Sequence, residues 1–204
     1  MAGIYRTRRR VMTPSPREEA VDALAESLNW KRVDDVQADV AAAVNREVVW
    51  QGIDGLALDY FESYLTGDCC VMALGDGPDL PERFIEQVDI ALEDSILAMG
   101  RLIDDVEQAD DPALLGRALI RLGLGAPLER NAEFFEVIVE SATGHADDRV
   151  RDTALVAMMY TDWSDFIPVL RQVLRDDASE RVRTRAEIVL RAFQATFGSA
   201  GDPE

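Results

Sequence analysis

Histidine, cysteine and lysine are scarce in this sequence. Its 204 residues include one histidine (His145), two cysteines (Cys69 and Cys70) and one lysine (Lys31). A zinc site needs three or four Cys and His ligands, which this supply does not provide. A disulfide between adjacent cysteines cannot link distant segments of a chain, so the sequence does not indicate the disulfide framework of a secreted protein. His145 lies in the turn "SATGHADD" with no nucleophile near it in the sequence. We therefore expect no catalytic residue, no metal site and no cofactor.

Long apolar runs are also missing. No run approaches the roughly 20 residues that span a membrane. The arginines of the opening "MAGIYRTRRRVMTPSP" are followed by no apolar segment, so this stretch does not resemble a secretory signal. We expect a cytoplasmic protein that does not contact a membrane.

Positive charge is in short supply. The sequence has 21 Lys and Arg against 39 Asp and Glu, a net charge of −18, and residues 31–100 hold 4 basic and 15 acidic groups. Nucleic acid and anionic membranes would be repelled by such a surface, whereas a basic protein surface would be attracted. The charge therefore predicts a protein partner with a basic surface and no nucleic acid bound by the chain alone. A need for solubility explains the same charge equally well.

Helical spacing dominates what the sequence does contain. Thr13 or Ser15 can cap a helix that has Pro16 in its first turn, and apolar residues at helical spacing follow over residues 33–48 and again from residue 82. Residues 53–80 are less clear, and almost no strict alternation is visible. We expect an all-α fold, with a basic disordered arm over residues 1–14, a single domain over 15–196 and a disordered tail over 197–204.

One face of the C-terminal half occurs twice. Val150, Ala154, Ala157 and Met158 lie on one side of a helix, and a shift of 32 residues gives the same pattern of apolar side chains at Val182, Ala186, Val189 and Leu190. Asp147 and Ser179 precede the two helices as N-caps. Repetition at this period is typical of stacked helical hairpins, which bury their faces against one another.

These residues resemble the HEAT-repeat family in its short bacterial form. The resemblance is specific over residues 147–193 and loose over 110–146, with residues 15–108 as a divergent helical cap or degenerate repeats. It implies a right-handed helical solenoid whose concave face binds a partner, usually a protein. It also implies that Arg151 and Arg183 bond the Asp-rich turns of adjacent repeats, although arginines 149, 151, 181, 183 and 185 could instead form a phosphate-binding ridge. The residues that carry the repeat pattern are Val150, Arg151, Ala154, Pro168, Asp176, Asp177, Val182, Arg183 and Ala186.

The function that fits these features is binding without catalysis, by an adaptor or regulator that holds a protein on an acidic face. An immunity or antitoxin protein that neutralises a basic nuclease-type toxin is the alternative. An enzyme that uses loop carboxylates such as Asp104 and Asp105 is a third hypothesis, and a HEAT-like DNA-acting enzyme would need a basic groove. Large aromatic residues often anchor protein interfaces, and with neighbouring acids they give the candidate partner-binding residues Trp50, Asp54, Asp59, Tyr60, Glu62, Tyr64 and Trp163.

Overall fold

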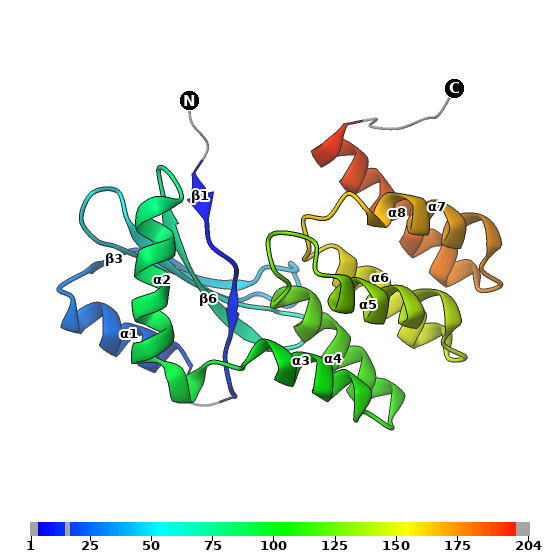
Figure 1. Cartoon of the computed structure of the whole chain (residues 1–204), viewed down its shortest axis with the longest axis horizontal. Helices are drawn as coiled ribbons and strands as arrows, with labels where there is room; N and C mark the ends of the chain where they lie inside the picture. Colours follow the sequence, from blue (N-terminus) through cyan, green and yellow to red (C-terminus); the bar gives the residue numbers. More distant parts are fainter. Residues whose placement is uncertain (1–3, 15–16, 199–204) are drawn as a thin grey trace. The chain divides into compact units, whose positions relative to one another are not determined.

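The chain divides into two compact units, one of which contains a β-sheet. The computed structural model describes residues 4–14 and 17–198. Unit 1 is Met1–Ala98 and unit 2 is Met99–Glu204 (Figure 1). Unit 1 is built on a six-stranded antiparallel sheet. The expectation of one all-α domain over residues 15–196, a helical solenoid with a helical cap, is therefore wrong.

The sheet of unit 1 is mainly a meander of four consecutive strands. These are β3 (Lys31–Val36), β4 (Arg46–Gln51), β5 (Ala57–Glu62) and β6 (Cys69–Gly75). Two short strands, β1 (Tyr5–Arg6) and β2 (Arg10–Val11), both pair with β6, so the order is β1-β6-β5-β4-β3. The edge strand β3 has a register irregularity between Arg32 and Asp34.

In β3 and β4, where the sequence suggested helices, the apolar residues are Val and Trp, types that fit a pleated surface better than a helix. Val33 and Val40, which belong to the apolar pattern at helical spacing, are 56% and 73% exposed. In the register of the sheet, Val48 lies opposite Tyr60 and Tyr60 opposite Val71, so alternate residues of three strands share one face.

The connection between β4 and β5, residues 52–56, contains a two-residue turn. Asp54 and Gly55 both have positive φ, +53° and +75°, and the Leu56 amide donates to the Ile53 carbonyl over 3.0 Å. This is the geometry of a type I′ hairpin turn, for which Asp-Gly is a preferred pair. The turn fixes the register of β4 on β5 and directs Asp54 to one end of the sheet.

Two helices cover one face of the sheet (Figure 1). They are α1 (Glu18–Ser27) and α2 (Asp79–Ala91), and a 3₁₀ turn, η1 (Glu93–Ser95), follows α2. The predicted cap residue Ser15 and Pro16 lie outside the described residues. Both helices pack on the sheet face that carries Tyr60. The buried core of unit 1 consists of Met12, Val21, Ala25, Val48, Trp50, Leu56, Leu58, Tyr60, Cys69, Val71, Ala73, Phe84, Ile85, Val88 and Leu92.

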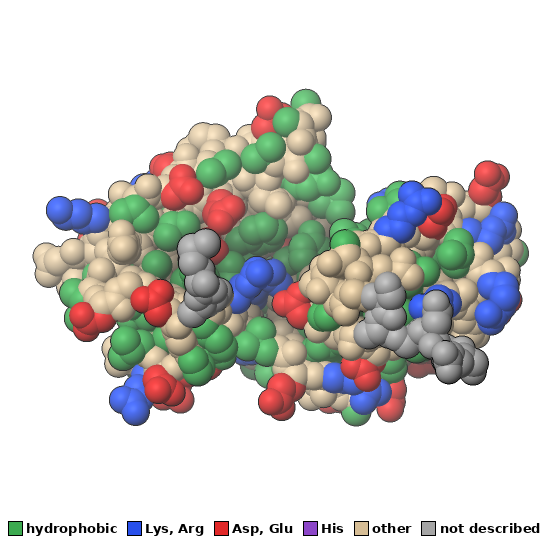
Figure 2. Space-filling model, turned by 90° about the horizontal axis from the view of Figure 1, so that it is seen from above, with side chains coloured by type: hydrophobic (Ala, Val, Ile, Leu, Met, Phe, Trp, Pro, Cys, Tyr) green, Lys and Arg blue, Asp and Glu red, His purple; other side chains and the backbone are tan. Residues whose placement is uncertain are grey.

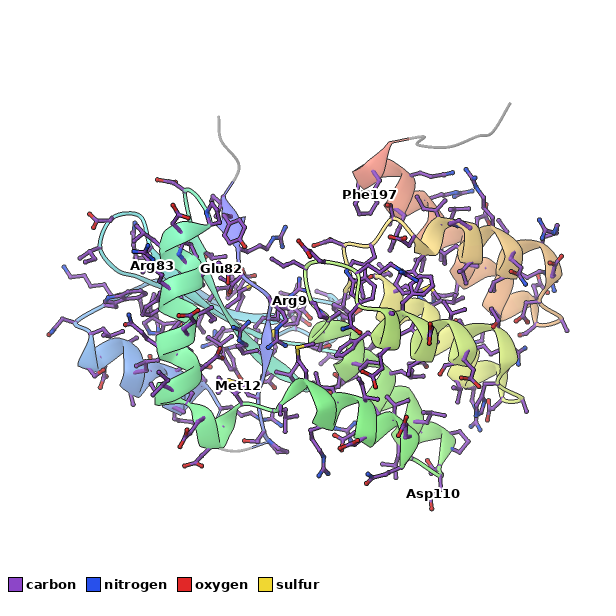
Figure 3. The ribbon with its side chains drawn as sticks, viewed as in Figure 1. Arg9, Met12, Glu82, Arg83, Asp110 and Phe197 are labelled. Atoms are coloured by element: carbon purple, nitrogen blue, oxygen red, sulfur yellow. The ribbon has the colours of Figure 1, made fainter. Side chains whose placement is uncertain are left out.

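Within the predicted disordered arm over residues 1–14, Tyr5–Arg6 and Arg10–Val11 pair with β6; residues 1–3 lie outside the described part. Two residues of the arm, Tyr5 and Arg10, bond side chains of α2. Arg10 donates Nε and Nη2 to the two carboxylate oxygens of Asp89, at 2.7 and 2.8 Å. The Tyr5 hydroxyl donates to Glu82, which lies on α2 (Figure 3).

Unit 2 consists of six helices over its described residues. They are α3 (Met99–Glu107), α4 (Pro112–Leu124), α5 (Ala132–Gly144), α6 (Asp148–Met158), α7 (Phe166–Asp176) and α8 (Glu180–Phe197). The helix α6 packs between α4 and α8, while α3, α5 and α7 pack on α4, α6 and α8, respectively (Figure 1). Of the predicted disordered tail, Phe197 ends α8 (Figure 3), and residues 199–204 lie outside the described residues.

The helix starts of unit 2 follow the expected capping chemistry in part. The Asp147 carboxylate accepts the Arg149 amide, so this predicted N-cap is confirmed. Ser179 precedes α8 but makes no cap bond; its hydroxyl donates instead to Asp148 of α6, over 2.7 Å. Ser179 therefore links α8 to α6.

The repeat is present in the hydrogen bonds of unit 2. Nη1 of Arg151 donates to the carbonyls of residues 145 and 146, and Nη1 of Arg183 donates to the carbonyls of residues 177 and 178, which are each 32 residues further along. Arg151 also donates Nε and Nη2 to the Asp177 carboxylate, at 2.8 and 2.9 Å. Val150, Ala154, Val182 and Ala186 are fully buried, whereas Pro168 is exposed in the first turn of α7 and Asp176 pairs with Arg175.

No helix in the described part of the chain combines the length and the apolar character needed to cross a membrane.

Candidate functional site

The aromatic residues proposed as partner anchors lie inside the molecule. Trp50 and Tyr60 belong to the core of unit 1, with 2% and 0% exposure, and Trp163 is 2% exposed in unit 2. Indole Nε1 of Trp163 donates to the carbonyls of Pro127 and Leu128. These three side chains therefore do not form one patch and are not available at the surface of the folded chain.

Glu62 and Tyr64, two of the candidate partner-binding residues, make hydrogen bonds within unit 1. Glu62 accepts the Tyr60 hydroxyl over 2.8 Å and pairs with Arg17 over 3.3 Å. Burial, together with the neighbouring Cys69 and Glu62, raises the pKa of Tyr60. Tyr64 is half-buried in the β5–β6 connection, where its amide donates to Asn45.

Asp59 lies on the sheet face opposite the two helices, with 4% of its surface exposed. Its Oδ1 atom has no hydrogen-bond partner among the described residues. Burial, reinforced by the charge of Glu47 and opposed by those of Arg9 and Arg6, raises its pKa to about 7. Asp59 can therefore hold a proton near neutral pH, but it does not belong to an exposed acidic surface.

Among the candidate partner-binding residues, Asp54 lines an open cleft. The cleft has a volume of about 340 Å³ and is formed where the β4–β5 turn meets the connection from β6 to α2. We call it the acidic cleft. Its lining residues are Asp54, Leu56, Gly75, Asp76, Gly77, Pro78, Asp79, Leu80 and Pro81.

Three carboxylates and no basic residue line the acidic cleft. The side chains of Asp54, Asp76 and Asp79 are exposed, and none of them makes a hydrogen bond or an ion pair with any residue that the structure describes. A Cβ atom on Gly55 would lie 3.2 Å from Asp76 Oδ2, so this carboxylate rests against the turn that carries Asp54. Like charges held together in this way attract a cation from outside the chain.

Several acids on α1 and the neighbouring strands are paired with arginines. Arg32 pairs with Glu18, Asp22 and Asp35, and Arg46 pairs with Glu18 and Asp35. The hydrogen bonds from Arg32 and Arg46 lower the pKa of Asp35. The unit as a whole has 9 basic and 19 acidic residues, and the acidic cleft is one place where its excess is left unpaired.

The floor and rim of the acidic cleft are apolar. Leu56 is buried beneath it, Pro81 packs against the end of β6, and Leu80 is 49% exposed. Ile53, next to Asp54 in the turn, is 74% exposed. Figure 2 shows acidic and apolar side chains lying next to one another on the surface it displays. The apolar floor and the three carboxylates of the acidic cleft fit a side chain with an aliphatic stem and a cationic end.

Except for Asp104, the groups of unit 2 considered for catalysis or phosphate binding bond neighbouring residues. Asp105 pairs with Arg101 and Arg121, and Asp104 is an exposed residue of α3. His145 accepts the Asp147 amide at Nδ1 over 3.1 Å. Arginines 149, 151, 181, 183 and 185 each bond a carboxylate or a carbonyl of unit 2.

Both thiols of the chain lie in the interior of unit 1. Cys69 and Cys70 are buried free thiols, and burial raises the pKa of Cys70 to about 12. Over the part of the chain that the structure describes, no group of three or more His, Cys, Asp or Glu side chains is arranged to hold a metal ion.

Comparison of the chain with protein-family models, with curated proteins and with solved structures found no match.

Sequence reasoning missed Asp76 and Asp79. They lie in "GDGPDLP", a breaker-rich segment with no motif, and come near Asp54 only because Ala57 pairs with Gln51 on one side and with Leu74 on the other. The dipeptide Asp54-Gly55 between two apolar runs was the signal that could have located this end of the sheet.

Proposed function

We propose that the protein is a non-catalytic binding protein whose acidic cleft receives a lysine or arginine side chain from a partner protein with a basic surface. The observation that carries this proposal is the convergence of three unpaired carboxylates on one apolar-floored cleft. We also place the protein in the cytoplasm, a compartment that keeps thiols reduced, because both of its cysteines are free.

The charge of the whole chain favours a basic protein over other partners. A net charge of −18 repels nucleic acid and anionic lipid, and it speeds the approach of a positively charged surface. The carboxylates of Asp54, Asp76 and Asp79 can accept hydrogen bonds from a guanidinium or ammonium group. The aliphatic stem of that side chain can cover Leu56 and Pro81.

The exposed apolar residues beside the cleft extend the docking surface. Ile53 and Leu80 flank the carboxylates and remain largely exposed in the chain. Protein interfaces combine an apolar centre with charged groups that set orientation and association rate. A partner that places a basic residue between apolar neighbours would match this arrangement.

The proposal is tested by comparing two variants that lose the same charge. In the cleft variant, Asp54, Asp76 and Asp79 become Asn; in the control, the exposed Glu129, Glu133 and Glu136 of unit 2 become Gln. Each tagged protein is used to recover partners from its native host at about 50 and 300 mM salt, and the affinity of a recovered partner is then measured with purified proteins.

We expect the unaltered chain and the control to bind the same basic partner, with affinity falling steeply as salt rises. The cleft variant is expected to lose at least about tenfold in affinity, since each lost charged hydrogen bond contributes about 1.5–3 kcal/mol. Equal weakening by both variants would show that the overall charge of the chain, and not the cleft, determines the affinity. Unchanged affinity of the cleft variant would exclude the cleft as the docking site.

A further inference from the structure

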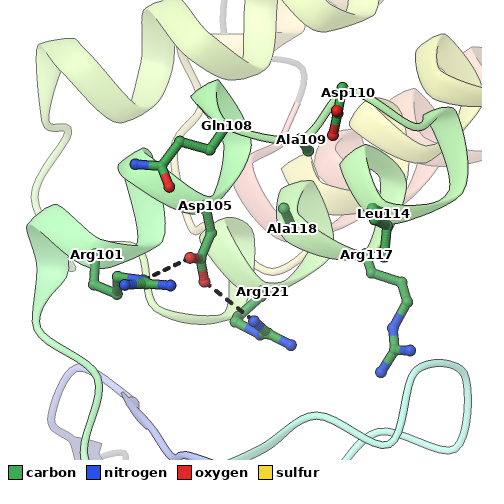
Figure 4. A pocket seen from close by; sticks show the side chains of 9 residues that line it. All are labelled: Arg101, Asp105, Gln108, Ala109, Asp110, Leu114, Arg117, Ala118 and Arg121. Atoms are coloured by element: carbon green, nitrogen blue, oxygen red, sulfur yellow. Dashed lines mark hydrogen bonds and ion pairs between the residues drawn. The ribbon is translucent and has the colours of Figure 1, made fainter.

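Unit 2 contains a cavity lined by three arginines, in contrast to the acidic cleft of unit 1. It has a volume of about 390 Å³ and is lined by residues of α3, α4 and their connection. We call it the arginine cavity (Figure 4). Its lining residues are Arg101, Asp105, Gln108, Ala109, Asp110, Leu114, Arg117, Ala118 and Arg121.

Helix geometry brings three guanidinium groups to this cavity. Arg117 and Arg121 are four residues apart on α4 and therefore share one side of that helix. Arg101 comes from α3, which packs on α4. In Figure 4 the side chains of Arg101 and Arg121 point toward Asp105, and Arg117 extends to one side of them.

Asp105 holds two of the arginines at fixed positions. Its Oδ1 accepts Nε of Arg101 over 2.6 Å, and its Oδ2 accepts Nη1 of Arg121 over 3.2 Å. The carboxylate thus joins cations from two helices that would otherwise repel each other. A guanidinium has five N–H donors, and Arg101, whose side chain is 60% exposed, uses one of them on Asp105.

The charge of the lining is unusual for this chain. Three arginines face two carboxylates, Asp105 and Asp110, so the lining carries a net charge of +1 in a chain of −18. Gln108 adds an amide that can donate hydrogen bonds. Guanidinium groups match the planar, two-oxygen edge of carboxylates and phosphates.

We propose that the arginine cavity binds a small oxyanion, a phosphate or carboxylate group carried by a small molecule. The size of the cavity fits such a group with part of its carrier. The negative charge of the rest of the chain disfavours a polyanion such as nucleic acid. This site is separate from the acidic cleft, and the two proposals stand or fall independently.

The test is a titration of the full-length, ¹⁵N-labelled protein at constant ionic strength. Sodium phosphate and sodium acetate are added separately, with sodium chloride as the reference, and the arginine Nε–H and Gln108 side-chain signals are followed by NMR. Saturable shifts with phosphate alone identify a phosphoryl ligand, and shifts with acetate identify a carboxylate; either result supports the proposal.

Two arginine variants test whether the oxyanion binds in the arginine cavity. Arg101→Gln, at the most exposed of the paired arginines, is expected to weaken oxyanion binding about tenfold, as the loss of a charged hydrogen bond predicts. Arg191→Gln removes an exposed arginine of α8 that pairs with Glu187 and is expected to leave binding unchanged. Circular dichroism and the unfolding midpoint verify that both variants fold. Shifts no larger than those caused by chloride, or equal weakening by both variants, would overturn the proposal.

Discussion

The guanidinium of Arg151 on α6 donates two parallel hydrogen bonds to the carboxylate of Asp177, from Nε and Nη2, at 2.8 and 2.9 Å. Both side chains are mostly buried, with 13% and 7% exposure. The pair joins the helix of one hairpin to the turn of the next, so it aligns successive layers of unit 2.

Replacing Arg151 with Lys is therefore expected to destabilise the chain by about 1–3 kcal/mol, because an ammonium cannot make the two parallel bonds. Urea unfolding at pH 7 measures the change. Arg175→Lys is the matched control, since Arg175 pairs with Asp176 at an exposed site, and should change the free energy of unfolding by less than about 0.5 kcal/mol. A similar loss in both variants would refute the alignment role.

The pair of Arg151 and Asp177 should make the stability of the chain depend on pH. The hydrogen bonds from Arg151 lower the pKa of Asp177 in the folded chain. Its contribution to stability is therefore complete above the unfolded pKa of about 3.9 and is lost as pH falls through the lower folded value. Asp177→Asn should be less stable than the unaltered chain at pH 7, and the difference should shrink below about pH 3. A difference that does not vary between these pH values would contradict this account.

Two glycines of α4 should respond in opposite ways to the same substitution. A Cβ on Gly123 would lie 2.4 Å from the carbonyl oxygen of Ala157 on α6, whereas a Cβ on Gly116 would meet only Thr153, at 3.5 Å. Gly123→Ala must push α4 away from α6 and should cost about 1–3 kcal/mol. Gly116→Ala should be neutral or stabilise the chain by up to about 1 kcal/mol, through helix propensity. Thermal and urea unfolding of the two variants compare these effects directly.

Asp59 should make the chain less stable as pH rises. Its folded pKa of about 7 lies above the ordinary value of 3.8, so between these values the unfolded chain has released the proton that the folded chain retains. Stability attributable to Asp59 is complete below about pH 4 and falls until about pH 7, by an amount on the order of a few kcal/mol. Asp59→Asn should flatten the decline in the free energy of unfolding between pH 5 and 8. Asp54→Asn, at an exposed position, should leave that decline in place.

The two thiols should be unreactive in the folded chain. Cys69 and Cys70 have 1% and 0% exposure, and burial raises the pKa of both. Because the thiolate is the reactive form, an aromatic disulfide reagent at pH 8 should release almost no colour from native protein. The same reagent should titrate two thiols per chain in urea. Rapid reaction of the native protein would show that β6 opens readily.

The helices of unit 2 could be located from the sequence because each buries one stripe of side chains, so a period near 3.6 survives in the pattern. Asp147 and the 32-residue interval marked α6 and α8 for this reason. The strands of unit 1 could not, because a strand such as β6 carries apolar residues on both faces: the adjacent Val71 and Met72 are both buried. When both faces carry apolar residues, the period of two is masked.

Of the three carboxylates of the acidic cleft, only Asp54 could be predicted from the sequence. Asp54 stood out as an acid near aromatic residues, although those aromatics are in the core. The approach of Asp76 and Asp79 depends on the pairing of β5 with β6, a contact between segments whose order along the chain does not reveal it. The arginine cavity had a local signal, the four-residue spacing of Arg117 and Arg121, but spacing alone cannot show that Arg101 joins them from another helix.

The outer strand β3 protects the sheet from growing. A second molecule that tried to extend the sheet there would meet the register irregularity between Arg32 and Asp34, and its backbone would run beside the carboxylates of Asp34 and Asp35. Broken register and edge charge are both means by which proteins avoid edge-to-edge aggregation and fibril formation. Removing the irregularity and both charges together would expose a smooth template and convert a self-limiting sheet into one prone to polymerise.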